Sequence, residues 1–142
     1  MFRGCRNLNT AGLDGWDTAK VAHFNDMFSG ATSFNGDVSG WDVGGATQSG
    51  NMFEGAAAFN ADLGGWDVSK FGSMNAMFNG ATIFDRDLAA WDTARVRFMP
   101  DLFHDAASFN GDISEWNVGS LRTSVAMFRR AGAFAGAGGL SS

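Results

Sequence analysis

Residues 27–43 read MFSGATSFNGDVSGWDV, and they contain every feature of a unit that recurs along the chain. The tryptophan of this stretch belongs to a column with a constant spacing of 25 residues: Trp16, Trp41, Trp66, Trp91 and Trp116. Its second phenylalanine belongs to a column with the same spacing: Phe34, Phe59, Phe84, Phe109 and Phe134. A fixed period between about 20 and 50 residues is typical of stacked arrays, so the sequence predicts a tandem repeat protein.

Two further motifs keep the same register. One is a pair of large apolar residues: Met27-Phe28, Met52-Phe53, Met77-Phe78, Leu102-Phe103 and Met127-Phe128. The other is an Asn-x-Asp motif: Asn35/Asp37, Asn60/Asp62, Asp85/Asp87 and Asn110/Asp112. We therefore predict a single repeat domain over residues 1–142, with units at 1–26, 27–51, 52–76, 77–101 and 102–126 and a partial unit at 127–142.

The apolar spacing within a unit predicts two short elements. Between residues 71 and 81, apolar side chains recur every three or four positions, which is typical of a short helix or of 3₁₀ turns. Gly80 then fits a residue with left-handed backbone at the end of the helix. Gly30 and Gly55 occupy the equivalent position in earlier units, and we expect Asp105 and Ala131 to occupy it in later units. The stretch 66–68 alternates apolar and polar residues, as in a strand with Trp66 and Val68 inward and Asp67 outward. The Asn-x-Asp motif predicts a turn.

Composition excludes several classes of protein. The chain has 142 residues, 45% of them hydrophobic and 18% charged, which suits one folded domain. The formal net charge of −5 argues against a nucleic-acid partner. No apolar run approaches the ~18 residues that a membrane span needs, so we predict no transmembrane segment. The single cysteine, Cys5, excludes an intramolecular disulfide. Because Met1 falls inside a repeat, we expect the chain to be a fragment or to have unusual ends.

The repeated unit resembles the 25/26-residue repeat of bacterial surface proteins, which occurs in mycoplasma-type lipoproteins as a domain of unknown function. It is also similar to the leucine-rich repeat of BspA-type surface proteins, in which an Ala-Phe-x-x-Cys-x-x-Leu stretch precedes the strand; residues 1–8 read MFRGCRNL. The resemblance covers about residues 1–134. It implies an α/β fold: a leucine-rich-repeat-like right-handed solenoid of about five coils, each a short strand plus a short helix or 3₁₀ turn. It also implies surface display, adhesion or protein interaction.

Some stretches depart from this pattern. Residues 46–50 weaken the apolar stripe of the second unit, and Pro100 predicts that the helix before Leu102 starts late or kinks. Residues 131–139 lose the motif and predict a frayed end. Neither end has a capping unit, so we expect either a longer parent chain or end-to-end self-association to cover the open apolar faces.

An acidic column follows the tryptophans, and it is the candidate interaction site: Asp17, Asp42, Asp67, Asp92 and Asn117. Stacked carboxylates repel one another, and calcium binding would relieve that repulsion. Alternatively, the Asp caps the next helical turn; Asp17, Asp67 and Asp92 are each followed three residues later by a basic residue that offsets the charge, namely Lys20, Lys70 or Arg95. A third reading is a basic binding partner. Neither acidic column has the spacing of an EF-hand loop, so we assign no metal ligand and no cofactor.

No catalytic constellation emerges from the sequence. The two histidines, His23 and His104, occupy different places in their units, and Cys5 is near neither of them in sequence. We therefore predict a non-enzymatic repeat scaffold that mediates protein interaction or adhesion, with a protein or glycan partner on its exposed face. The alternative is a calcium-stabilised structural spacer with no binding face. A cell-surface or secreted location is implied by the resemblance alone.

Overall fold

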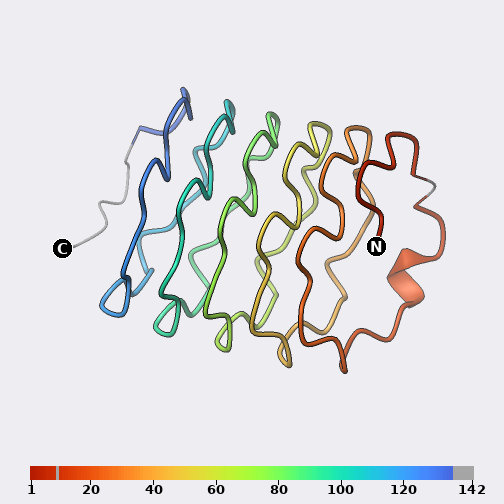
Figure 1. The fold of residues 1–142 in the computed structure, drawn as a ribbon, viewed down its shortest axis with the longest axis horizontal. Helices are drawn as coiled ribbons and strands as arrows, with labels where there is room; N and C mark the ends of the chain where they lie inside the picture. The colour runs from red at the N-terminus through yellow and green to blue at the C-terminus, as the bar shows by residue number, and fades with distance from the viewer. Residues whose placement is uncertain (9, 136–142) are drawn as a thin grey trace.

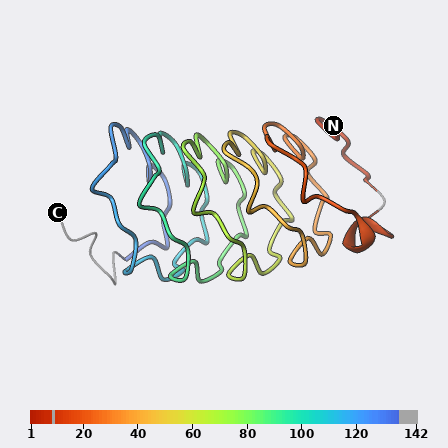
Figure 2. The ribbon, with the colours of Figure 1, turned by 90° about the horizontal axis from the view of Figure 1, so that it is seen from below.

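The computed structural model describes residues 1–8 and 10–135. The chain winds into successive coils that stack side by side from the N-terminus to the C-terminus (Figure 1). The same row of coils is seen after a quarter turn (Figure 2). Each coil lies against the next because residues 25 positions apart are neighbours: for example, the Phe53 ring stacks on Phe28 and on Phe78, with centroids 5.6 and 5.7 Å apart.

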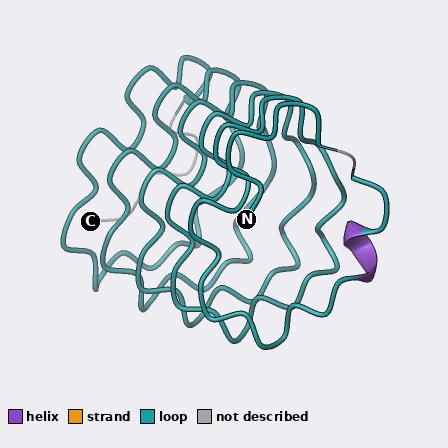
Figure 3. Ribbon diagram, turned by 45° about the vertical axis from the view of Figure 1, so that its right-hand side comes forward, coloured by secondary structure: helices purple, strands orange, loops and turns teal. Residues whose placement is uncertain are grey.

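The predicted α/β solenoid of strand-plus-helix coils is wrong. Within the described residues the only helix is η1, a 3₁₀ helix at Leu13–Gly15, and no continuous strand or sheet forms (Figure 3). The coils are built from turns and extended connections. Isolated parallel bridges link one residue per coil: His23, Gln48, Ser73, Phe98 and Thr123.

The expected helix at residues 71–81 fails because its backbone amides bond to the next coil. The amides of Met74, Phe78 and Gly80 donate to carbonyls of residues 98, 102 and 104, at 2.8–2.9 Å. The intervening amides of Met77 and Asn79 donate three residues back. An isolated helix of this length is marginal in water, whereas each inter-coil bond is reinforced by the stacking of the coils.

The expected strand at residues 66–68 also fails, although its side chains point as predicted. Trp66 and Val68 are buried and Asp67 is exposed. However, the Trp66 amide donates to the Leu63 carbonyl within its own coil, at 3.0 Å. Parallel bridging occurs instead around residues 48 and 73, in the part of each unit where a helix was expected.

Left-handed backbone positions recur at two places in each coil. Gly30, Gly55 and Gly80 have φ values of 70, 66 and 70°, and Asp105 takes that place with φ 55°, as predicted. In the last coil the position falls on Arg130, with φ 62°, so the prediction of Ala131 is wrong. The second column was not predicted: Asp26, Asn51, Ala76, Asp101 and Ala126 have φ between 49 and 56°.

The predicted aromatic columns lie in the core, together with buried Leu, Met, Val, Ile and Ala side chains. Equivalent rings of the Phe28 column stack with centroids 5.5–5.7 Å apart, and those of the Phe34 column with centroids 5.7–6.0 Å apart. Tryptophans 41, 66, 91 and 116 are buried, and each donates its indole N–H to a carbonyl 28 residues earlier, at 2.7–3.0 Å. Trp16 has no complete coil before it and is 40% exposed.

The departures from the repeat fit this backbone. Pro100 neither kinks nor delays a helix, because no helix forms there; its carbonyl accepts from the Ala76 amide at 2.9 Å. Ala46 and Ser49 are fully buried, so the weakened second stripe still contributes to the core. The predicted fraying of residues 131–139 lies partly outside the described residues, which end at 135; within them Phe134 still stacks on Phe128, with centroids 4.0 Å apart. No helix among the described residues has the length and apolarity to span a membrane.

Candidate functional site

The acidic column lies on the surface, and its side chains close turns. Each member accepts a hydrogen bond on Oδ1 from the backbone amide two residues later, at 3.0–3.2 Å; the members are Asp17, Asp42, Asp67, Asp92 and Asn117. This is the local capping that the sequence suggested, applied to a turn instead of a helix. No ion pair among the described residues links an Asp of this column to its expected basic neighbour.

Three exposed carboxyl groups have depressed pKa values because their own turns donate to them. At Asp37 and Asp67, the hydroxyls of Ser39 and Ser69 lower the pKa most, and the amides of the same serines add to the effect. The charge of Lys70 makes a smaller contribution to the lowered pKa of Asp67. At Asp112 the amide of Ser114 has the largest effect on the pKa and its hydroxyl the next. These carboxylates are stabilised in their charged form by local hydrogen bonds.

The Asn-x-Asp motif forms both turns and a ladder between coils. Asp37, Asp62 and Asp112 accept from the amide two residues later, as predicted. The first residue of the motif instead accepts from the backbone amide of its equivalent in the next coil, at 2.9–3.1 Å; the acceptors are Asn35, Asn60, Asp85 and Asn110. Sequence reasoning identified this motif but not its bonds across coils.

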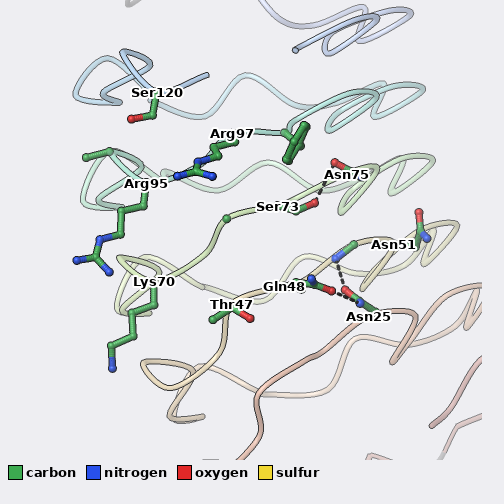
Figure 4. A pocket seen from close by; sticks show the side chains of 14 residues that line it. Asn25, Thr47, Gln48, Asn51, Lys70, Ser73, Asn75, Arg95, Arg97 and Ser120 are labelled. Atoms are coloured by element: carbon green, nitrogen blue, oxygen red, sulfur yellow. Dashed lines mark hydrogen bonds between the residues drawn. The ribbon is translucent and has the colours of Figure 1, made fainter. Parts of the chain in front are cut away.

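A groove of about 830 Å³ runs along the stack over the bridged residues, and its residue Lys70 lies close enough to the acidic column to lower the pKa of Asp67. Its lining comes largely from equivalent positions of successive coils, so it follows the stacking direction; three coils supply most of the lining, and Asn25 and Ser120 come from the coils on either side. Lys70 and Arg95 extend along one side, Asn51 and Asn75 lie on the other, and Arg97 lies between them (Figure 4). We call this feature the cationic groove.

The charges of the cationic groove are all positive. Lys70, Arg95 and Arg97 line it, and none of its fourteen lining residues is Asp or Glu. The whole chain carries 15 acidic and 10 basic residues, so the groove is positively charged on a chain whose formal net charge is negative. Over residues 1–8 and 10–135, no ion pair and no side-chain hydrogen bond involves the side chain of Lys70, Arg95 or Arg97.

Amides and hydroxyls complete the lining. Asn25 donates through Nδ2 to Gln48 Oε1 at 2.9 Å, and Ser73 Oγ donates to Asn75 Oδ1 at 3.0 Å. These bonds use the amide oxygens of Gln48 and Asn75, and no side-chain hydrogen bond in the described part of the chain uses their NH₂ groups, which are therefore available as donors. Phe98 supplies an aromatic ring that is 37% exposed. The groove therefore offers cations, neutral donors and one apolar face.

The residues with catalytic side chains are dispersed. Cys5 is a free, exposed thiol, and no hydrogen bond in the described part of the chain joins it to a histidine. His23 lies 3.5 Å from the Thr47 hydroxyl, and His104 lies between Asp101 and Asp105, at 3.2 and 3.6 Å. The described residues contain no cluster of three or more His, Cys, Asp or Glu side chains placed to hold a metal ion.

The sequence contained evidence of the groove at positions that vary between units, but these positions lie outside the columns that define the repeat. The bridged position carries His23, Gln48, Ser73, Phe98 and Thr123, one of the most irregular sets in the unit. Lys70 and Arg95 were interpreted only as partners of the acidic column. Placing them beside Arg97 and Phe98 required knowing that residues 95–98 cross an exposed face of the coil.

Comparison with known families supports the interpretation of the repeats. A family described as "Mycoplasma protein of unknown function, DUF285" matches residues 1–81 and again residues 61–139, so the two matches together span nearly the whole chain. No curated protein and no solved structure matches the chain.

Proposed function

The chain belongs to the family of mycoplasma proteins of unknown function, DUF285, and from this premise we propose that it is a non-enzymatic repeat scaffold that binds a partner through the cationic groove. The observation that carries the proposal is the set of unpaired cations on one face of an acidic chain. Lys70, Arg95 and Arg97 have no carboxylate within ion-pairing distance among the described residues. Charged groups held without partners on a surface are available to a ligand.

The acidic column is the competing surface. Its Oδ1 atoms already accept backbone hydrogen bonds at 3.0–3.2 Å, which explains their recurrence without a partner. The groove cations close no turn and form no ion pair among the described residues, although the charge of Lys70 contributes to the lowered pKa of Asp67. We therefore favour the groove over the acidic column as the binding face, and we keep the column as the alternative site.

Adhesion and surface display extend this proposal. The resemblance to bacterial surface repeats supports both, and a stack of coils presents an elongated face suited to an extended ligand. The alternative function is a calcium-stabilised spacer. It predicts a higher melting temperature in millimolar calcium than in chelator, whereas the groove proposal predicts the same melting temperature in both.

The test is binding of the labelled protein to intact cells and to cell-free extracellular matrix. The groove variant carries Arg95→Glu and Arg97→Glu. The matched control carries Arg6→Glu and Arg129→Glu, which reverse the charge of two exposed arginines outside the groove. We expect the wild type and the control to bind and the groove variant to lose binding. Equal binding by all three proteins would refute the groove as the site, and no binding by the wild type would refute the adhesion role.

A further inference from the structure

The cationic groove has a chemistry that identifies one class of ligand. Arg95 and Arg97 carry planar guanidinium groups, which bind carboxylates or sulfates through two parallel hydrogen bonds. Lys70 and Arg95 occupy equivalent positions of adjacent coils, so positive charge repeats at the coil spacing on this side of the groove. A ligand that matches this row carries acidic groups at regular intervals along its length.

The neutral lining favours a ligand rich in hydroxyl groups. The NH₂ groups of Gln48 and Asn75 are donors, and the hydroxyls of Thr47 and Ser120 both donate and accept. Phe98 has no aromatic equivalent at the bridged position of the neighbouring coils, which carry Ser73 and Thr123. An exposed ring beside amides and hydroxyls suits a sugar, because a pyranose has polar edges and an apolar face of C–H groups.

The backbone of this face disfavours an extended acidic peptide. A peptide that adds as a strand needs unpaired backbone groups at an edge. Here Gly72 donates to the Thr47 carbonyl at 2.8 Å, and the Phe98 carbonyl accepts from Met74 at 2.9 Å, so these groups are used between coils.

The repeat distance points the same way. Parallel bridged backbones lie ~4.8 Å apart, whereas side chains on one face of an extended peptide recur about every 6.5–7 Å. A linear polysaccharide advances by roughly the coil spacing with each pyranose residue. Successive sugars can therefore meet successive coils in register, whereas successive side chains on one face of an extended peptide recur at a longer interval.

We propose that the ligand of the cationic groove is a linear acidic polysaccharide, bound with its chain along the stack and its acidic groups on Lys70, Arg95 and Arg97. This inference rests on the proposed function, since it names the partner of the same groove. Phe98 packs on the apolar face of one sugar ring, and the donors of Gln48 and Asn75 bind ring hydroxyls.

The experiment is calorimetric titration of the full chain with hexasaccharides of galacturonate, hyaluronan and heparin, which differ in the spacing and type of acidic group. A fully methyl-esterified galacturonate hexasaccharide keeps the sugar rings without the charge, and poly-glutamate keeps the charge without the sugars. We expect at least one acidic saccharide to bind and both controls to bind at least about tenfold more weakly.

Two variants identify the site. Arg95→Ala with Arg97→Ala should weaken saccharide binding about tenfold or more, because two charge-assisted contacts are lost, whereas Arg129→Ala should leave it unchanged. Phe98→Ala should weaken binding of the saccharide and leave any binding of poly-glutamate unchanged. The urea midpoint of each variant shows whether it is folded.

The outcomes separate this inference from the proposed function. Binding of poly-glutamate with the same dependence on Arg95 and Arg97, and of no saccharide, would overturn the polysaccharide and leave the groove as the site. Saccharide binding that survives loss of both arginines would overturn both proposals. Failure of every acidic saccharide would overturn the polysaccharide inference, and the cell-binding assay would then decide the proposed function separately.

Discussion

The acidic column and the cationic groove lie on the same coils and differ in how their side chains are used. The column repeats in every unit, and each of its Oδ1 atoms accepts a backbone amide. The groove cations recur in only part of the stack, since the position of Lys70 and Arg95 carries Gly45 and Ser120 in the flanking units. Lys70, Arg95 and Arg97 have no ion-pair partner within the described residues. This difference indicates that a residue repeated in every unit can stabilise the coil itself, whereas a surface residue present in only some units is available to bind a ligand.

The largest expected effect is on stability, in the repeated columns. Trp66→Ala should reduce the free energy of unfolding by about 3–5 kcal/mol, because it removes a buried ring and its indole bond to the Val38 carbonyl. Trp16→Ala is the matched control, since the same residue type is 40% exposed there, and it should cost less than half as much. Urea denaturation measures both losses. Equal losses would contradict the burial described for the central column.

A smaller effect is expected in the acidic column. Asp67→Ala removes the acceptor for the Ser69 amide and should reduce the free energy of unfolding by about 1 kcal/mol. Asp67→Asn keeps an acceptor, as Asn117 does in the last coil, and should cost less. Urea midpoints of the two variants give the comparison. If Asp67→Asn costs as much as Asp67→Ala, the negative charge matters more than the turn, and a role in cation or partner binding gains support.

The pH dependence of stability tests the same turns. The pKa of Asp37 is below its ordinary value of 3.8, because the Ser39 hydroxyl and amide donate to its carboxylate. A group with a lower pKa in the folded state stabilises the fold above its unfolded pKa, and this stability is lost as the pH falls through the folded pKa. Ser39→Ala should therefore flatten the loss of stability below pH 3.8 and also lower stability at neutral pH. Urea midpoints at a series of acidic pH values measure this slope. An unchanged slope would show that Ser39 does not hold the Asp37 carboxylate.

The smallest effect on stability is expected in the groove. Arg95→Ala with Arg97→Ala should change the free energy of unfolding by no more than about 0.5 kcal/mol, since neither side chain is paired or buried. The Arg129→Ala variant should change the free energy of unfolding by an equally small amount. A loss of more than about 1 kcal/mol from the groove variant would show that these arginines hold the coils together, and the contrast between the two regions would fail.

Sequence reasoning predicted the parts of the fold that depend on the side chain of a single position. The period, the buried Trp66, the exposed Asp67 and the left-handed Gly80 follow from residue type and register. The backbone of the coil could not be predicted in this way. The pattern at residues 71–81 fits a helix, but inter-coil hydrogen bonds such as Phe78 to Leu102 depend on the stacking itself.

The groove was harder to predict for a related reason. Phe98 does not repeat, and Arg97 recurs only once, as Arg122 in the next unit, so neither position formed a column that drew attention to it. Lys70 and Arg95 do share a column, but their spacing from the aspartates suggested a charge partner that the structure does not pair with them. Their common surface arises only where the coils stack.

The most direct test of this account is to map the binding of an acidic hexasaccharide by amide chemical shifts of the full chain. We expect the shift changes to gather on residues 70–75 and 94–98, with the indole signal of Trp66 unchanged because the core is undisturbed. Shift changes that gather instead on Asp42, Asp67 and Asp92 would contradict this expectation. They would show that the ligand binds at the repeated acidic column and that the cationic groove takes no part in binding.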